Sequence, residues 1–159
     1  QALTAFNKRR KLIVGILSKD PMYALDTNDY LIASGDTAGY CAVCEQKDSP
    51  YALEYIQAWL TNEYTERILQ IIGSDFENGF YSRGRSVLVT LPFVELDFDD
   101  SKQKSIYDRV VEATREVYRI NEELNSQPAK RIVATLQRQK ESLISEIQGL
   151  IVSVYRLEF

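Results

Sequence analysis

The sequence predicts a globule of the mixed α/β class (α+β), followed by a long antiparallel pair of helices. Short runs rich in β-branched and aromatic residues, bounded by turn residues, occupy the first part of the chain over 11–44. The last third instead repeats apolar residues at intervals of three and four. An acidic stretch over 95–100 separates the two patterns. We therefore expect a globule over 1–94 and a helical hairpin over 101–159.

The runs expected to form strands alternate with turn signals. Asp20-Pro21 and the Thr-Asn-Asp sequence at 27–29 mark turns, and glycines interrupt the chain before the last run. Each run is too short and too β-branched or aromatic for a helix. The expected strands cover 11–17, 22–25, 30–33 and 40–44.

Helical spacing replaces the strand pattern after residue 48. Ser49-Pro50 is a pair typical of a helix start. Apolar residues at helical spacing follow over 53–60, and a second amphipathic piece over 68–72 ends at Gly73, a common helix stop. Residues 74–86 then predict a polar, glycine-containing loop, which leads into a short apolar segment closed by proline.

Two heptad seams predict the helical hairpin. The breaker Asn-Ser-Gln-Pro at 125–128 divides them, so two long helices joined by a tight turn must run antiparallel and pack seam to seam. Gln139 and Lys140 interrupt the second seam, which we expect to be weak or bent there. The seam positions are Ile106, Val110, Ala113, Val117, Ile120 and Leu124 in the first helix, and Ile132, Leu136, Leu143, Ile147, Leu150, Val154 and Leu157 in the second.

The composition argues against a stand-alone enzyme. The chain has no histidine, which removes the commonest general base and metal ligand. Cys41 and Cys44 lack a second ligand pair for zinc, and structural thiols on a strand are favoured over a metal or redox role. Free thiols fit a reducing cytoplasm.

No apolar run approaches the ~20 residues of a membrane span. A chain that starts at Gln1 is expected to be a fragment of a longer protein.

Four pieces of the chain share their order with a known family. Residues 10–14 lead from basic residues into a strand, and residues 55–64 form a helix that ends in Thr-Asn, where the family has a Leu-Asn-Ser type turn. Residues 79–93 contain a Gly-aromatic loop followed by an apolar segment that is terminated by Leu-Pro. The last helix, 146–157, ends in Tyr-Arg-Leu. The chain resembles the TaqI-like C-terminal specificity domain of adenine-specific DNA methyltransferases and fused type II restriction–modification enzymes. It is also similar to the recognition subunits of multi-subunit restriction enzymes.

This resemblance implies sequence-specific recognition of double-stranded DNA by the target-recognition domain of a bacterial, cytoplasmic methyltransferase. The sequence has neither an Asn-Pro-Pro-Tyr motif nor a glycine-rich S-adenosylmethionine loop. We therefore expect no catalytic centre, metal or cofactor in this fragment. Methyl transfer from S-adenosylmethionine to adenine, and any DNA cleavage, would belong to the rest of the parent protein. The expected partners are DNA and the catalytic domain of the same chain, with self-association through the hairpin as a further option.

The densest basic cluster is the first candidate DNA contact. Lysine and arginine neutralise the phosphate backbone and release counterions, whereas the alternative is a solvated leader before a strand. The cluster is Lys8, Arg9, Arg10 and Lys11.

The loop between the second helix and the proline-closed segment is the second candidate. Arginine can pair in bidentate fashion with guanine, and hydroxyls can reach phosphates or base edges. Arg83 or Arg85 is the preferred base contact, while the alternative is an ordinary surface loop whose Phe80 and Tyr81 pack inward. Asn78, Lys19 and Lys47 are weaker candidates. The residues assigned to this candidate are Lys19, Asn78, Tyr81, Ser82, Arg83 and Arg85.

The formal net charge of −4 favours a rival interpretation. A DNA-binding domain usually has an excess of lysine and arginine. The alternative is therefore a coiled-coil protein–protein interaction module without DNA binding.

The acidic stretch could suggest a metal site at Asp97, Asp99 and Asp100. No nuclease-type pattern accompanies these residues, and acids near a helix start suit the helix dipole.

Overall fold

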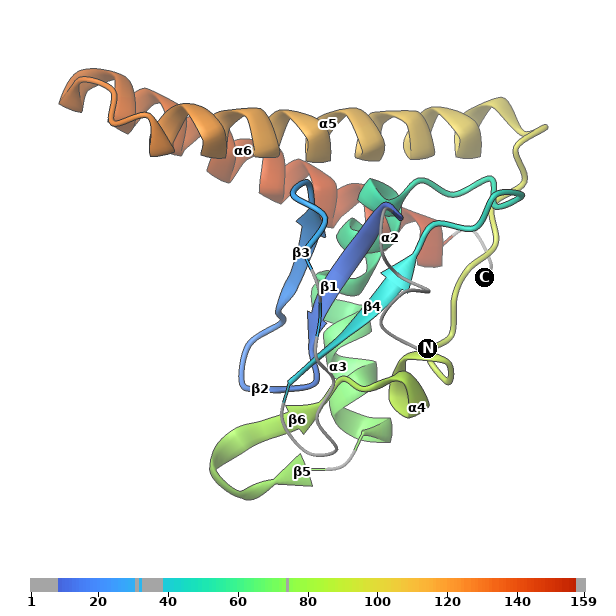
Figure 1. Cartoon of the computed structure of the whole chain (residues 1–159). Coiled ribbons are helices and arrows are strands. Elements are labelled where there is room, and N and C mark those ends of the chain that lie inside the picture. The colour runs from blue at the N-terminus through green and yellow to red at the C-terminus, as the bar shows by residue number, and fades with distance from the viewer. Residues whose placement is uncertain (1–8, 31, 33–38, 74, 157–159) are drawn as a thin grey trace. The chain divides into compact units, whose positions relative to one another are not determined.

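The computed structural model divides the chain into two compact units (Figure 1), residues 1–93 and 94–159. The predicted fold class is confirmed, since small antiparallel sheets and short helices form the first unit and two long packed helices form the second. The residues described are 9–30, 32, 39–73 and 75–156.

The first sheet has the order β3-β1-β4, with both pairs antiparallel. Its central strand β1 (Lys11–Gly15) lies between β3 (Tyr23–Asp26) and β4 (Tyr40–Cys44). Two of the predicted strands are thus confirmed, at β3 and β4. The strand expected over 30–33 is not formed by Tyr30 or Ile32, and residues 31 and 33 lie outside the described part.

The strand expected over 11–17 is split at Ile16. Its last part, β2 (Leu17–Ser18), joins a second sheet of order β2-β6-β5. The Ile16 amide donates to the Gly39 carbonyl at 3.0 Å, and the Ile16 carbonyl accepts from the Arg83 amide at 2.6 Å. Through these two bonds Ile16 contacts residues next to both sheets, so one continuous segment, with a bend at Ile16, passes from the first sheet into the second.

Helices α2 (Leu53–Leu60) and α3 (Glu63–Ile72) follow the first sheet. The helix start expected at Ser49-Pro50 is wrong, because α2 begins at Leu53 and the Ser49 hydroxyl instead accepts from the Tyr51 amide at 3.2 Å. Buried Asn62 caps α3 by accepting from the Tyr64 amide. The helix stop at Gly73 is confirmed.

Residue 74 lies outside the described part, and residues 75–86 do not form the loop that we expected over 74–86. They contain β5 (Asp75–Phe76), a 3₁₀ turn (Glu77–Gly79), β6 (Phe80–Ser82) and the start of the short helix α4 (Arg85–Leu88). Asn78 and Gly79 have φ values of 67° and 75°, so this pair reverses the chain between the two strands. An Asn-Gly pair is a strong hairpin signal, which the polar residues around it obscured.

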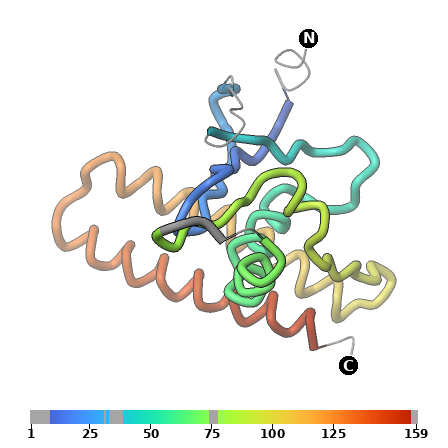
Figure 2. Tube along the Cα trace, turned by 90° about the horizontal axis from the view of Figure 1, so that it is seen from below, coloured from blue at the N-terminus to red at the C-terminus, as the bar shows by residue number. Residues whose placement is uncertain are grey.

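The second unit consists of α5 (Ser101–Asn125) and α6 (Lys130–Tyr155), which run antiparallel side by side (Figure 2). The Asp100 carboxylate caps α5 by accepting from the Lys102 amide at 2.8 Å. The predicted hairpin is confirmed, but two seam positions of α6 are wrong: Ile151 is fully buried whereas Leu150 is half-buried, and Ile132 is exposed. Leu157 lies outside the described residues. None of the described helices is both long and apolar enough to span a membrane.

Candidate nucleic-acid interface

An open pocket of about 390 Å³ lies where β1 begins and β4 ends. The chain returns to this point because Lys11 pairs with Cys44 in the sheet, and the Glu45 amide donates to the Arg10 carbonyl at 3.2 Å. Basic residues from both strand ends therefore meet, although they are far apart in sequence. The lining residues are Arg9, Arg10, Glu45, Gln46, Lys47 and Ser49.

The two arginines of this pocket are held differently. Arg9 donates to the Glu45 carbonyl at 3.0 Å, a neutral acceptor. Arg10 binds the buried Glu54 carboxylate at 2.6 Å and the Glu45 carboxylate at 3.4 Å. The hydrogen bond to Glu54 raises the pKa of Arg10, and Glu45 adds to this rise. Arg9 and Lys47, beside the Ser49 hydroxyl, are the donors best placed for an oxyanion such as a phosphate.

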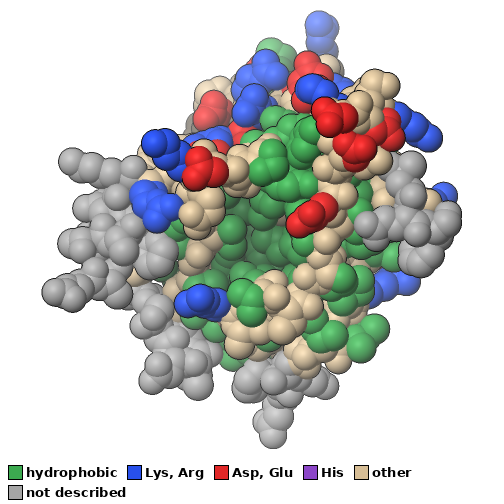
Figure 3. Space-filling view, turned by 90° about the vertical axis from the view of Figure 1, so that its right-hand side faces the viewer, with side chains coloured by type: hydrophobic (Ala, Val, Ile, Leu, Met, Phe, Trp, Pro, Cys, Tyr) green, Lys and Arg blue, Asp and Glu red, His purple; other side chains and the backbone are tan. Residues whose placement is uncertain are grey.

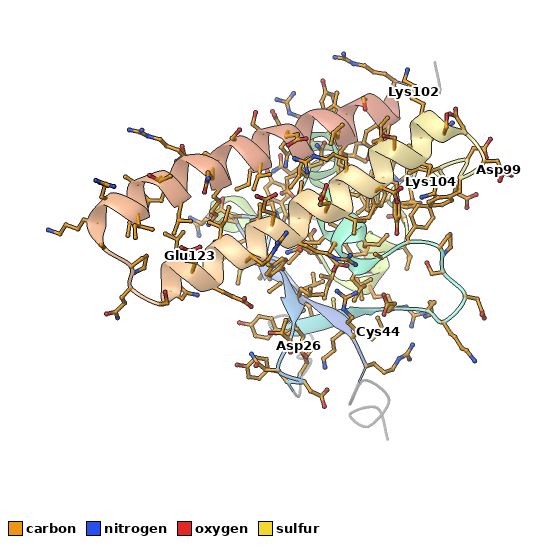
Figure 4. All side chains as sticks on the ribbon, turned by 90° about the horizontal axis from the view of Figure 1, so that it is seen from above. Asp26, Cys44, Asp99, Lys102, Lys104 and Glu123 are labelled. Carbon is orange, nitrogen blue, oxygen red and sulfur yellow. The ribbon has the colours of Figure 1, made fainter. Side chains whose placement is uncertain are left out.

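Lys11 is not an exposed basic residue, as the cluster had led us to expect. Its side chain is 1% exposed and binds Asp26 at 2.6 Å and Asp29 at 3.3 Å. Asp26 and Cys44 lie on the strands that flank Lys11 (Figure 4). Lys11 is therefore engaged within the first unit and offers no surface to a phosphate. Lys8 lies outside the described residues.

The second candidate cluster lies on and beside the β5–β6 hairpin. Asn78 is exposed at the turn, and the Lys19 ammonium lies 5.3 Å from the centroid of the Phe80 ring. Tyr81 and Ser82 are half-buried on β6, where they pair with β2. The structure thus brings Lys19 next to the hairpin, although it comes from a distant part of the sequence.

The two arginines of this cluster differ in exposure. Arg85 is exposed at the first residue of α4. Arg83, in contrast, is fully buried, and its guanidinium binds Glu66 of α3. The expectation that Arg83 projects from an exposed loop is therefore wrong, because its five donors are directed into the protein.

Sequence reasoning missed the acidic partners of both clusters. Glu54 and Glu66 lie on helices where an acidic residue is commonplace, so nothing local marks them as partners of Arg10 and Arg83.

On the face in Figure 3, the described lysines and arginines are interspersed with aspartates and glutamates and do not form one basic patch. Within the described residues, no group of three Cys, Asp or Glu could hold a metal ion. Cys41 and Cys44 are free and half-buried.

No protein-family model matches the chain. Over 110 residues, or 69% of its length, the chain is 41% identical to the type II restriction enzyme and methyltransferase RM.Eco57I of Escherichia coli. The matched region spans 11% of that protein. The chain is therefore similar to a small part of a restriction–modification enzyme.

Proposed function

We propose that the chain is a DNA-recognition part of a bacterial restriction–modification enzyme, of the TaqI-like specificity-domain type. The observation that carries the proposal is the 41% identity over 110 residues to a restriction enzyme and methyltransferase. The pocket at Arg9 and Lys47 and the exposed hairpin turn at Asn78 support it, because they supply cationic and hydrogen-bonding groups at the surface.

The two clusters suit different parts of DNA recognition. Phosphate contacts position a protein on the duplex, whereas base contacts specify the sequence. We assign the pocket to the phosphate backbone, and Lys19, Asn78 and Arg85 to the groove, with Tyr81 and Ser82 beside them. Methyl transfer from S-adenosylmethionine to adenine, and any cleavage, belong in this proposal to the catalytic parts of the parent protein, which would contact this chain in the bacterial cytoplasm.

Gel-shift titration of the 159-residue chain against a randomised duplex pool, repeated over a series of salt concentrations, tests this function. DNA binding through phosphate contacts gives an affinity that falls steeply with salt, by about 0.9 in log–log slope per phosphate. The rival protein-interaction module, which the net charge of −4 favours, gives no shift at any salt concentration. That second outcome would refute the DNA-recognition proposal.

A further inference from the structure

Arg83 connects three segments of the first unit from the base of the β5–β6 hairpin. Its side chain donates to the Ser18 and Lys19 carbonyls and to the Ser18 hydroxyl, which lie 65 and 64 residues earlier in the chain. It also donates to the Tyr81 carbonyl of β6 at 3.3 Å and to the Glu66 carboxylate on α3. The hairpin, the end of β2 and helix α3 therefore share one fully buried cation.

This arrangement restricts the movement of the hairpin relative to β2 and α3. A guanidinium presents its donors in a fixed planar fork, so several acceptors must hold their positions together. A buried charge that loses one of its partners is strongly unfavourable. Movement of the hairpin away from α3 would separate Arg83 from Glu66, and movement away from β2 would break the bond from the Arg83 amide to the Ile16 carbonyl.

The opposite end of the hairpin has no such support. Asn78 is exposed, and a side chain built at Gly79 would meet no atom within 4 Å. Lys19 connects the base of the hairpin with this turn. Its carbonyl accepts from Arg83, and its ammonium lies over the Phe80 ring, next to the turn. The turn is thus open to solvent while its base is fixed.

We propose that Arg83 is a positioning residue that fixes the β5–β6 hairpin on α3, and that Asn78 and Lys19 at its turn determine sequence specificity. This inference rests on the proposed DNA-recognition function. A two-stranded ribbon fits the major groove, where asparagine pairs with adenine and lysine with guanine. Arg83 itself touches no DNA.

Hydrogen–deuterium exchange of the full 159-residue chain tests the positioning role without DNA. Glu66→Gln keeps the side-chain size and Arg83→Lys keeps the positive charge, and both weaken the buried contact, so exchange at 80–82 should accelerate about tenfold or more. Glu63→Gln is the matched control, because it alters an exposed ion pair with Arg67 on the same helix. Unchanged exchange at 80–82 in both test variants would overturn the positioning role.

Selection of preferred duplexes from a random pool tests the specificity role. Asn78→Gly, which removes the side-chain amide but tolerates the positive φ of this turn, and Lys19→Ala should change the preferred sequence and leave hairpin exchange as in the wild type. Glu66→Gln and Arg83→Lys should weaken binding of all sequences alike, because a mobile hairpin loses affinity before it gains a new preference. A changed preference in Arg83→Lys with normal hairpin exchange would show that Arg83 reads DNA directly and overturn the inference.

The two tests separate the inference from the function on which it rests. If the wild-type chain shows salt-dependent DNA binding but Asn78→Gly and Lys19→Ala keep its preference, the specificity role fails and the proposed function stands. If the wild-type chain binds no duplex, the proposed function and the specificity role both fail. The exchange result then decides the positioning role of Arg83 alone.

Discussion

Lys11 and Asp26 form an ion pair in which Nζ and Oδ2 are 2.6 Å apart and both side chains are 1% exposed. The pair joins β1 to β3, where the two residues are in register. The same carboxylate also accepts from the Asn28 amide at 3.0 Å and the Tyr30 amide at 2.9 Å. One buried charge therefore ties together two strands and the turn that follows β3.

Replacing Lys11 by methionine should strongly destabilise the chain. The substitution keeps the length of the side chain but leaves Asp26 buried without its cation, which costs roughly 3–5 kcal/mol of unfolding free energy. Urea denaturation of the 159-residue chain measures this loss. Lys47→Met, at an exposed lysine, is the control. A loss below about 1 kcal/mol would show that the Asp26 charge finds other compensation.

Stability should also fall as the solution becomes acidic, because of Asp26. Burial alone would raise the pKa of Asp26, but the hydrogen bonds from Lys11 and from the Asn28 and Tyr30 amides outweigh it and lower the pKa. A lowered folded-state pKa stabilises the fold above the unfolded value of about 3.9, and this contribution is lost as pH falls through the folded value. Urea midpoints measured from pH 6 downwards should decline below about pH 4. In Asp26→Asn this part of the decline should be absent.

In the helical hairpin, the cost of truncation should follow burial and not heptad position. Ile151→Ala removes a fully buried side chain and should cost roughly 2–5 kcal/mol. Leu150→Ala, at a half-buried seam position, should cost clearly less. Glu123→Ala, at an exposed position (Figure 4), should stay within about 0.5 kcal/mol. Thermal unfolding ranks the three variants, and a larger cost at Leu150 than at Ile151 would favour the simple heptad assignment.

Removal of Arg9 and Lys47 should weaken DNA binding without changing the preferred sequence. Arg10 is left in place, since it also binds the buried Glu54 and its loss would disturb the fold. If each removed side chain contacts one phosphate, the log–log salt slope should flatten by about 0.9 per side chain. Lys130→Ala with Arg131→Ala makes the same charge change at exposed positions of α6. An identical effect of both pairs would mean that total charge, and not the pocket, governs binding.

Local patterns predicted the elements that depend on neighbouring residues. The β-branched run of β1 and the periodic seams of α5 and α6 are dictated by short-range spacing, and they appear where expected. The Asn78-Gly79 pair also marks a hairpin turn by its residue types, but we expected a loop there. These features need no knowledge of distant segments.

Distant contacts account for the errors. The burial of Arg83 depends on Ser18 and Glu66, and the burial of Lys11 depends on Asp26. A basic residue in a polar stretch has the same local pattern whether it faces solvent or a buried carboxylate. The break at Ile16 likewise depends on Gly39 and Arg83, which no periodicity at 11–17 can show.

The continuous segment that crosses between the two sheets at Ile16 limits the distance between the pocket and the hairpin turn. Arg10 at the pocket and Lys19 beside the hairpin turn are joined by nine residue steps, and at about 3.3 Å per step these span at most about 30 Å. For the proposed role, that length corresponds to less than one turn of duplex, which is about 34 Å. In that role the segment alone would reach less than one turn of duplex, and bases farther along a target would need contacts from outside it, such as Asn78 and Arg85.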